Sequence, residues 1–441
     1  MERMMKPLAL TACTLAAALA PVALTAPLSA QETDDAVTVT AEQTALEMRA
    51  DQVIALLNGE IEPEDVLTEG FIAQVPPAQL KAISAAWTTQ YGKALSVEEL
   101  PNAGGTRSAI AIRFERAIAR GGIAIDAGED NRISELLIQT FDIVGDTPQK
   151  IAADLDALAG EVSYWFGPVG GGEPVLASQP EAQMPLGSTF KLYVLAALAR
   201  EVADGKRNWN DQVTLGKPRS FPSGMMQDWP EDAPVTLHTL ASMMIAISDN
   251  TATDQLIGVL GRDAVFETLV NSGHSEPALN DPFLTTREMF LLKSGPAGRL
   301  ATYQRGDADV RLQVLDGLET FATPASEVEA AFLNGPIALD VEWFASAADL
   351  AALMRFMRET ADPEAFAIMG INPSMLDSSR TDWAYAGYKG GSEPGVLNLT
   401  WLLTDHEGRD HVLVLSWRND AASLDASALE AIAQRIHALP Q

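Results

Sequence analysis

Strand-like segments lie at both ends of a helix-rich region, residues 147–441, and this arrangement constrains the fold more than any other feature. The first segment is 162–166, and the last two are 396–403 and 411–417. Between them apolar residues recur at helical spacing, and a final helix is expected over 423–437. Strands at both ends bury their apolar faces by meeting in one sheet. We therefore predict an α+β domain, with an antiparallel sheet built from both ends of the region and a helical lobe inserted between them.

Residues 31–146 are expected to form a separate, smaller domain. Apolar periodicity predicts helices over 40–59 and 79–90. Strand-like runs follow at 95–100, 107–114, 122–126 and 132–141, with turn residues between them. Helices followed by a meander indicate a small α+β domain with a structural or recognition role.

Residues 1–30 have the composition of a secretory signal peptide, with a basic start at 1–6 and an apolar core at 7–26. Cleavage is expected after Ala30, which makes the protein periplasmic or secreted. The single cysteine, Cys13, follows a run that resembles a lipoprotein box. Too few apolar residues precede it and too many follow it for a normal lipoprotein signal, so lipidation is the lesser alternative. The cleaved chain would have no cysteine for a disulfide or a thiolate metal site.

The charge of the chain restricts its partners. Acidic residues outnumber basic ones by 60 to 30, for a formal net charge of -30. Such a polyanion repels nucleic acid and anionic membranes, and no later segment is apolar for long enough to span a bilayer. The five histidines are scattered without metal-ligand spacing. We expect a monomer that acts on a small molecule and needs neither cofactor nor metal.

Ser188 and Lys191 lie three residues apart at the start of an apolar helix. This spacing places the hydroxyl and the ammonium group on one face, near the positive end of the helix dipole. A desolvated lysine loses its proton readily and can then act as a general base for a serine nucleophile. By itself the spacing favours the simpler interpretation, a lysine that extends from a core helix to solvent.

Two further motifs supply complementary groups. Ser248 and Asn250 follow the apolar helix at 240–247, and offer a hydroxyl for proton relay and an amide for substrate binding. Asp249, between them, is expected to cap local backbone. Lys389 would provide a fixed cation.

Lys389 is followed by glycines that allow close approach of backbone to a ligand. Gly391 is one of them, and the N–H of Ser392 could pair with that of Ser188 as an oxyanion hole. Alone, each of these motifs is an ordinary helix end or glycine-rich turn.

Together and in this order, the motifs resemble those of the serine acyltransferases that include class A β-lactamases and penicillin-binding proteins. The resemblance implies that Ser188 attacks a lactam carbonyl, and that Lys191 and Ser248 move protons. It also implies that Asn250 holds the substrate amide and that Lys389 pairs with the substrate carboxylate. The two-domain layout resembles that of a clavam-pathway serine hydrolase, whose front domain is similar to ketosteroid-isomerase-like cones.

The chain departs from the family pattern in two places. Glu276 opens a Glu-x-x-Leu-Asn sequence like that of the deacylating glutamate in class A enzymes, but it follows Ser248 early, and Asp340 and Glu342 are rivals for this role. The family has Lys-Thr-Gly or Lys-Ser-Gly where this chain has Lys389, Gly390 and Gly391. The lost hydrogen bond to a substrate carboxylate is worth about 1.5–3 kcal/mol, and the nearby Glu393 adds negative charge.

The predicted function is therefore that of an exported serine hydrolase, with β-lactam hydrolysis and Glu276 in deacylation as the leading hypothesis. The alternatives are an esterase or peptidoglycan-type peptidase that uses the same acylation groups, and a β-lactam or muropeptide sensor that acylates without turnover or only binds.

Overall fold

The structure, a computed structural model, describes residues 43–318, 323–375 and 377–439. The predicted signal peptide lies outside the described residues. The chain divides into two compact units, and the boundary in the sequence lies between Gly145 and Asp146. In the part of the chain that the structure describes, no helix combines the length and the apolarity needed to cross a membrane.

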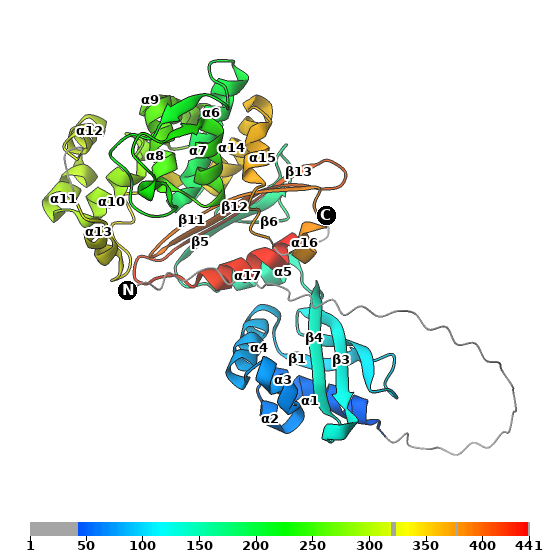
Figure 1. The fold of residues 1–441 in the computed structure, drawn as a ribbon. Coiled ribbons are helices and arrows are strands. Elements are labelled where there is room, and N and C mark those ends of the chain that lie inside the picture. The colour runs from blue at the N-terminus through cyan, green and yellow to red at the C-terminus, as the bar shows by residue number, and fades with distance from the viewer. Residues whose placement is uncertain (1–42, 319–322, 376, 440–441) are drawn as a thin grey trace, which may run out of the picture. The chain divides into compact units, whose positions relative to one another are not determined.

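The N-terminal unit combines helices with an antiparallel sheet in the order β1-β2-β3-β4 (Figure 1). Its elements are α1 (Ala45–Leu57), α2 (Pro63–Val66), α3 (Glu69–Gln74), α4 (Pro77–Tyr91), β1 (Ala94–Glu99), β2 (Arg107–Phe114), β3 (Ala117–Asp126) and β4 (Arg132–Ile143). Leu46, Ala50 and Val53 recur along α1 at helical spacing and are fully or almost fully buried. They pack in one core with Ile112 of β2 and Ile123 of β3. The sequence did not predict α2 and α3, since helices of four and six residues are too short to show periodicity.

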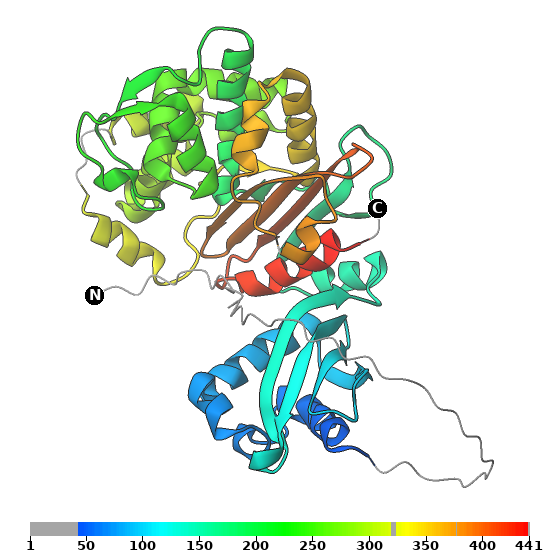
Figure 2. The same cartoon turned by 45° about the vertical axis from the view of Figure 1, so that its right-hand side comes forward.

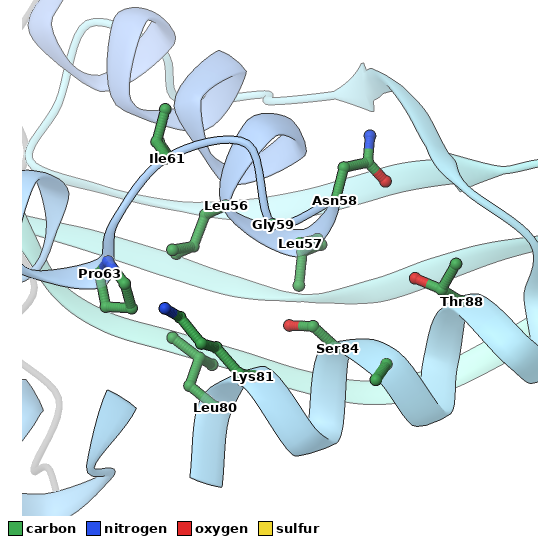
Figure 3. A pocket seen from close by; sticks show the side chains of 11 residues that line it. Leu56, Leu57, Asn58, Gly59, Ile61, Pro63, Leu80, Lys81, Ser84 and Thr88 are labelled. Carbon is green, nitrogen blue, oxygen red and sulfur yellow. The ribbon is translucent and has the colours of Figure 1, made fainter. Parts of the chain in front are cut away.

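A cavity of about 320 Å³ lies between α4 and the C-terminal end of α1 with the loop that follows it (Figure 3). Its walls are mostly apolar and include Leu56, Leu57 and Leu80. The buried hydroxyl of Ser84 also lines it and has no hydrogen-bond partner in the structure. Lys81, a further lining residue, forms an exposed ion pair with Glu62. The two helices are therefore not closely packed at this end.

The C-terminal unit contains a five-stranded antiparallel sheet in the order β11-β12-β13-β5-β6. Its strands are β5 (Glu161–Pro168), β6 (Leu176–Ser178), β11 (Tyr385–Glu393), β12 (Val396–Thr404) and β13 (Asp410–Arg418). Short strand pairs join β7 (Met184–Pro185) to β10 (Phe344–Ala345) and β8 (Gln212–Thr214) to β9 (Pro234–Thr236). Strands from both ends of the region thus meet in one sheet, which confirms the predicted fold class.

Helices cover both faces of this sheet (Figures 1 and 2). On one face lie α5 (Pro148–Asp156) and α17 (Ala426–His437), and the short α16 (Asp377–Arg380) precedes β11. The helical lobe on the other face comprises α6 (Lys191–Ala203), α7 (Leu237–Ala246), α8 (Asn250–Leu260), α9 (Arg262–Asn271), α10 (Thr286–Ser294), α11 (Ala297–Arg305), α12 (Ala308–Asp316), α13 (Ala325–Phe332), α14 (Ala347–Thr360) and α15 (Glu364–Met369).

Alternation along the strands divides the apolar side chains between two cores, because successive strand residues point to opposite faces. On β13, Leu413 and Leu415 pack in the core with α5 and α17, whereas Val412 and Val414 pack against the helical lobe. Helix α6 lies within the lobe, where every residue from Lys191 to Ala199 is buried. A 3₁₀ turn, Gly187–Phe190, leads into it from the sheet side.

Truncation of Leu415 to alanine should destabilise the protein by about 2–5 kcal/mol, because the fully buried side chain would leave a cavity beneath α17. Leu333→Ala is the matched control, since that leucine is 83% exposed, and its effect should stay within about 0.5 kcal/mol. Urea unfolding of the full chain, followed by tryptophan fluorescence, measures both. Equal unfolding midpoints for the two variants would contradict this packing.

Candidate active site

Lys191, at the first position of α6, has an ammonium group that is completely withdrawn from solvent. Its Nζ lies within hydrogen-bond distance of the backbone oxygen of Ser248 (2.6 Å), the Ser248 hydroxyl (3.1 Å) and Oδ1 of Asn250 (2.7 Å). The structure therefore brings the first two motifs together around one nitrogen. Ser188, in the 3₁₀ turn one helical turn before Lys191, is only partly buried.

The junction between α7 and α8 holds Ser248 in place. Ser248 has a left-handed backbone, with φ 60°, a conformation that is costly for a non-glycine residue. Asp249 is fully buried and caps α8 by accepting the N–H of Ala252 at 2.9 Å. Its other oxygen accepts the N–H groups of Met225 and Met226 at 2.7 and 2.8 Å. The expected capping role of Asp249 is thus confirmed, and these bonds secure the strained turn.

Lys389 approaches the same hydroxyl from the sheet. Its Nζ donates to Ser248 Oγ at 3.1 Å and also contacts the backbone oxygen of Gly390. Lys389 lies inside strand β11, which pairs with β12 along its whole length. The sequence had suggested a glycine-rich turn at this point. Pairing with β12 overrides the weak strand propensity of the glycines.

Two glycines allow β11 to pass directly beside the 3₁₀ turn. A Cβ at position 391 would lie 2.1 Å from the carbonyl oxygen of Leu186 and 2.4 Å from the backbone nitrogen of Ser188. Gly187 has φ +49°, and a Cβ there would lie 2.8 Å from the backbone nitrogen of Ser392. The backbone nitrogens of Ser188 and Ser392 are therefore in neighbouring, tightly packed segments, as a pair of oxyanion donors requires.

Burial shifts the ionisation of both lysines. Desolvation lowers the pKa of Lys191 well below its usual range, and the charge of Lys389 lowers it further. Desolvation also lowers the pKa of Lys389, to about 7. A neutral Lys191 can accept a proton, and Lys389 is still cationic below neutral pH.

Glu276 is not joined to this group of side chains. It is exposed and caps the 3₁₀ turn Pro277–Asn280, and its backbone N–H donates to Nδ1 of His274. No hydrogen bond of the described residues connects its carboxylate to Lys191 or Ser248. Its rival Asp340 is also exposed and accepts from Gln304. The role of Glu276 in deacylation stays a prediction.

The other rival, Glu342, is buried behind the 3₁₀ turn, where its carboxylate accepts the N–H of Gly187 at 3.2 Å. Lys293 of α10 contacts both Glu342 and Glu393. The sequence analysis missed Lys293, although a signal was present: it is a lysine in the apolar segment Phe290–Lys293, as Lys191 is in its own helix. Among the described residues, no group of His, Cys, Asp and Glu side chains could hold a metal ion.

Comparison with known protein families gives one match. The model of the family Beta-lactamase2, described as "Beta-lactamase enzyme family", matches residues 147–437. No curated protein matches the chain significantly.

Similar solved structures include a β-lactamase from Sphaerobacter thermophilus DSM 20745, with 21% identity, a TM-score of 0.45, and coverage of 66% of this chain and 93% of that one. PBP-A has 16% identity and a TM-score of 0.45, over 66% of this chain and 94% of that one. An ancestral (GNCA) class A β-lactamase has 17% identity and a TM-score of 0.46, over 66% and 97%. Because the family match spans the sheet, the helical lobe and all three motifs, this chain belongs to the β-lactamase enzyme family.

Proposed function

We propose that the protein is a serine hydrolase that forms an acyl-enzyme on Ser188, with β-lactams as the leading substrate class. One observation carries the proposal: the Ser248 hydroxyl lies 3.1 Å from the ammonium nitrogens of both Lys191 and Lys389, which come from distant parts of the chain. A hydroxyl between a base and a cation can pass a proton from one side of a substrate to the other. The signal-like composition of residues 1–30 supports export of this enzyme.

Acylation begins at the Ser188 hydroxyl. Its oxygen forms a bond to the substrate carbonyl carbon, while its proton passes to the neutral amine of Lys191. The carbonyl electron pair moves onto oxygen, where the N–H groups of Ser188 and Ser392 would stabilise the anion. The resulting tetrahedral intermediate lies at the N-terminal end of α6, where the helix dipole also favours negative charge.

Collapse of this intermediate requires a proton on the leaving group. The carbon–nitrogen bond of a lactam breaks, and the nitrogen receives the proton from Lys191 through the Ser248 hydroxyl. Asn250 would orient the substrate amide, although its Oδ1 also accepts from Lys191. Lys389 would pair with a carboxylate beside the leaving nitrogen. Addition of water to the acyl-enzyme then releases the acid and restores Ser188.

A second function, acylation without rapid turnover, is favoured by the position of Glu276. Glu276 is exposed, and the hydrogen-bond partners of Lys191 Nζ among the described residues are Ser248 and Asn250. If no other group activates water at the acyl carbonyl, the acyl-enzyme persists and the protein acts as a sensor. An esterase or peptidase is the third possibility, because the same acylation groups serve an ester or a peptide.

Labelling of the intact protein with a fluorescent penicillin or fluorophosphonate tests the nucleophile. Ser188→Ala should abolish the label, because no other serine is expected to combine the base with the oxyanion donors. The exposed Ser275 offers a matched control, and Ser275→Ala should still take up label. A label that survives Ser188→Ala, or wild-type protein that takes up none, would contradict the mechanism.

The time course of the same label separates the candidate functions. Label that appears and clears indicates a hydrolase, and permanent label indicates a sensor. Parallel assays with nitrocefin and simple acetate esters then distinguish β-lactam hydrolysis from esterase activity.

The affinity for anionic substrates should fall above neutral pH. The pKa of Lys389 is lowered to about 7, so its charge is present below pH 7 and is lost as the pH rises through that value. KM for a carboxylate-bearing β-lactam should therefore rise by up to about tenfold per pH unit above pH 7. KM for a neutral acetate ester is the control and should not follow this slope. Equal pH profiles for the two substrates would argue against carboxylate binding by Lys389.

A further inference from the structure

A buried cluster of charged side chains lies directly behind the candidate oxyanion hole. Lys293 of α10 places its Nζ 3.3 Å from Glu342 Oε1 and 2.5 Å from Glu393 Oε1. The side chains of Lys293 and Glu342 are 0% exposed, and that of Glu393 is 9% exposed. We refer to these residues as the Lys293 cluster. None of them has a role in the acylation mechanism above.

The Lys293 cluster is connected to the segments that carry both oxyanion donors. Glu342 Oε2 accepts the N–H of Gly187, the residue immediately before Ser188, at 3.2 Å. The same oxygen accepts the N–H of Trp343 at 3.3 Å. Glu393 directly follows Ser392 on β11. Lys293 thus links Glu342, which binds the backbone before Ser188, to Glu393, which follows Ser392.

We infer that the Lys293 cluster positions the oxyanion hole, by holding the backbone nitrogens of Ser188 and Ser392 at a fixed separation. This inference rests on the proposed function, since it assigns these residues to the same reaction. Lys293, Glu342 and Glu393 are positioning residues and do not contact the substrate. A donor displaced from its position stabilises the developing anion less, which lowers the acylation rate.

The charge balance of the cluster is consistent with this role. With both carboxylates ionised, the cluster has one uncompensated negative charge beside the place where the oxyanion develops. Burial and the Glu342 carboxylate raise the pKa of Glu393 to about 8, which favours a protonated Glu393 and a neutral cluster at neutral pH. The charged groups in contact with Glu393 are Lys293 and Glu342, and its β12 partner, Val396, is uncharged. Oε2 of Glu393 accepts no hydrogen bond and is available for this proton.

Lys293→Met and Glu342→Gln test the inference in the full-length protein. Both should lower the acylation rate constant for a fluorescent penicillin by about tenfold or more. They should weaken phenylboronic acid by a similar factor, because its tetrahedral adduct places an anionic oxygen in the oxyanion hole. The concentration for half-maximal acylation should change less than the rate constant. Asp146→Asn is the matched control: it disrupts a buried ion pair with Arg435, remote from the site motifs, and should alter neither quantity.

A third variant, Glu393→Gln, tests the inference if Lys293→Met and Glu342→Gln fail to fold. Its acylation rate is compared with that of the wild type at pH 7 and pH 9. The wild type should lose rate as Glu393 ionises and places negative charge behind the oxyanion, whereas glutamine cannot ionise. The ratio of variant to wild-type rate should therefore increase at least threefold between these pH values. Titration of Lys191 and Lys389 affects both proteins and cancels in the ratio.

The outcomes distinguish this inference from the proposed function. Wild-type protein that neither takes up penicillin nor binds the boronate overturns both. If the wild type does both, two results overturn the inference alone. One is a ratio of Glu393→Gln to wild-type rate that does not change with pH. The other is folded Lys293→Met and Glu342→Gln variants with the acylation rate and boronate affinity of the wild type.

Discussion

The desolvation of two lysines around one serine hydroxyl is the interaction on which the rest of the site depends. Each buried ammonium group would favour solvent, and their proximity adds repulsion. The structure compensates with fixed oxygen acceptors: the backbone and Asn250 for Lys191, and Gly390 for Lys389. Release of a proton relieves both costs, so burial favours the neutral amine that the proposed acylation requires of Lys191. A solvated lysine at the same position would remain charged and could not take the serine proton.

The approach of both lysines to Ser248 also depends on backbone features elsewhere in the domain. Ser248 meets both lysines with a left-handed backbone, and Asp249 stabilises the turn by accepting three backbone N–H groups. Strand β11 reaches the 3₁₀ turn only where glycine replaces a side chain. The helical lobe supplies the first two motifs and the sheet supplies the third. A domain assembled from both ends of its sequence brings them together.

The sequence predicted the local elements better than their contacts. Its strand runs 396–403 and 411–417 correspond to β12 and β13, because buried strands are continuously apolar. Strand β11 was not recognised, since its glycines have low strand propensity and its pairing with β12 is a tertiary effect. The grouping of the motifs followed from family resemblance and not from the residues alone. Lys293 and Glu342 are 49 positions apart, so no local pattern joins them.

The surroundings of Glu393 and Gly390, beside Lys389, differ from what the sequence suggested. The sequence suggested that Glu393 would repel an anionic substrate, but the residue is buried against Lys293 and its raised pKa favours its protonated form at neutral pH. A side chain at position 390 would require the Tyr388 ring to move, because a Cβ there would lie 2.0 Å from the Tyr388 hydroxyl. That hydroxyl belongs to a ring that packs on Trp401 of β12. In the proposed mechanism, binding of an anionic substrate therefore depends on Lys389, whose pKa of about 7 leaves it only partly charged at neutral pH.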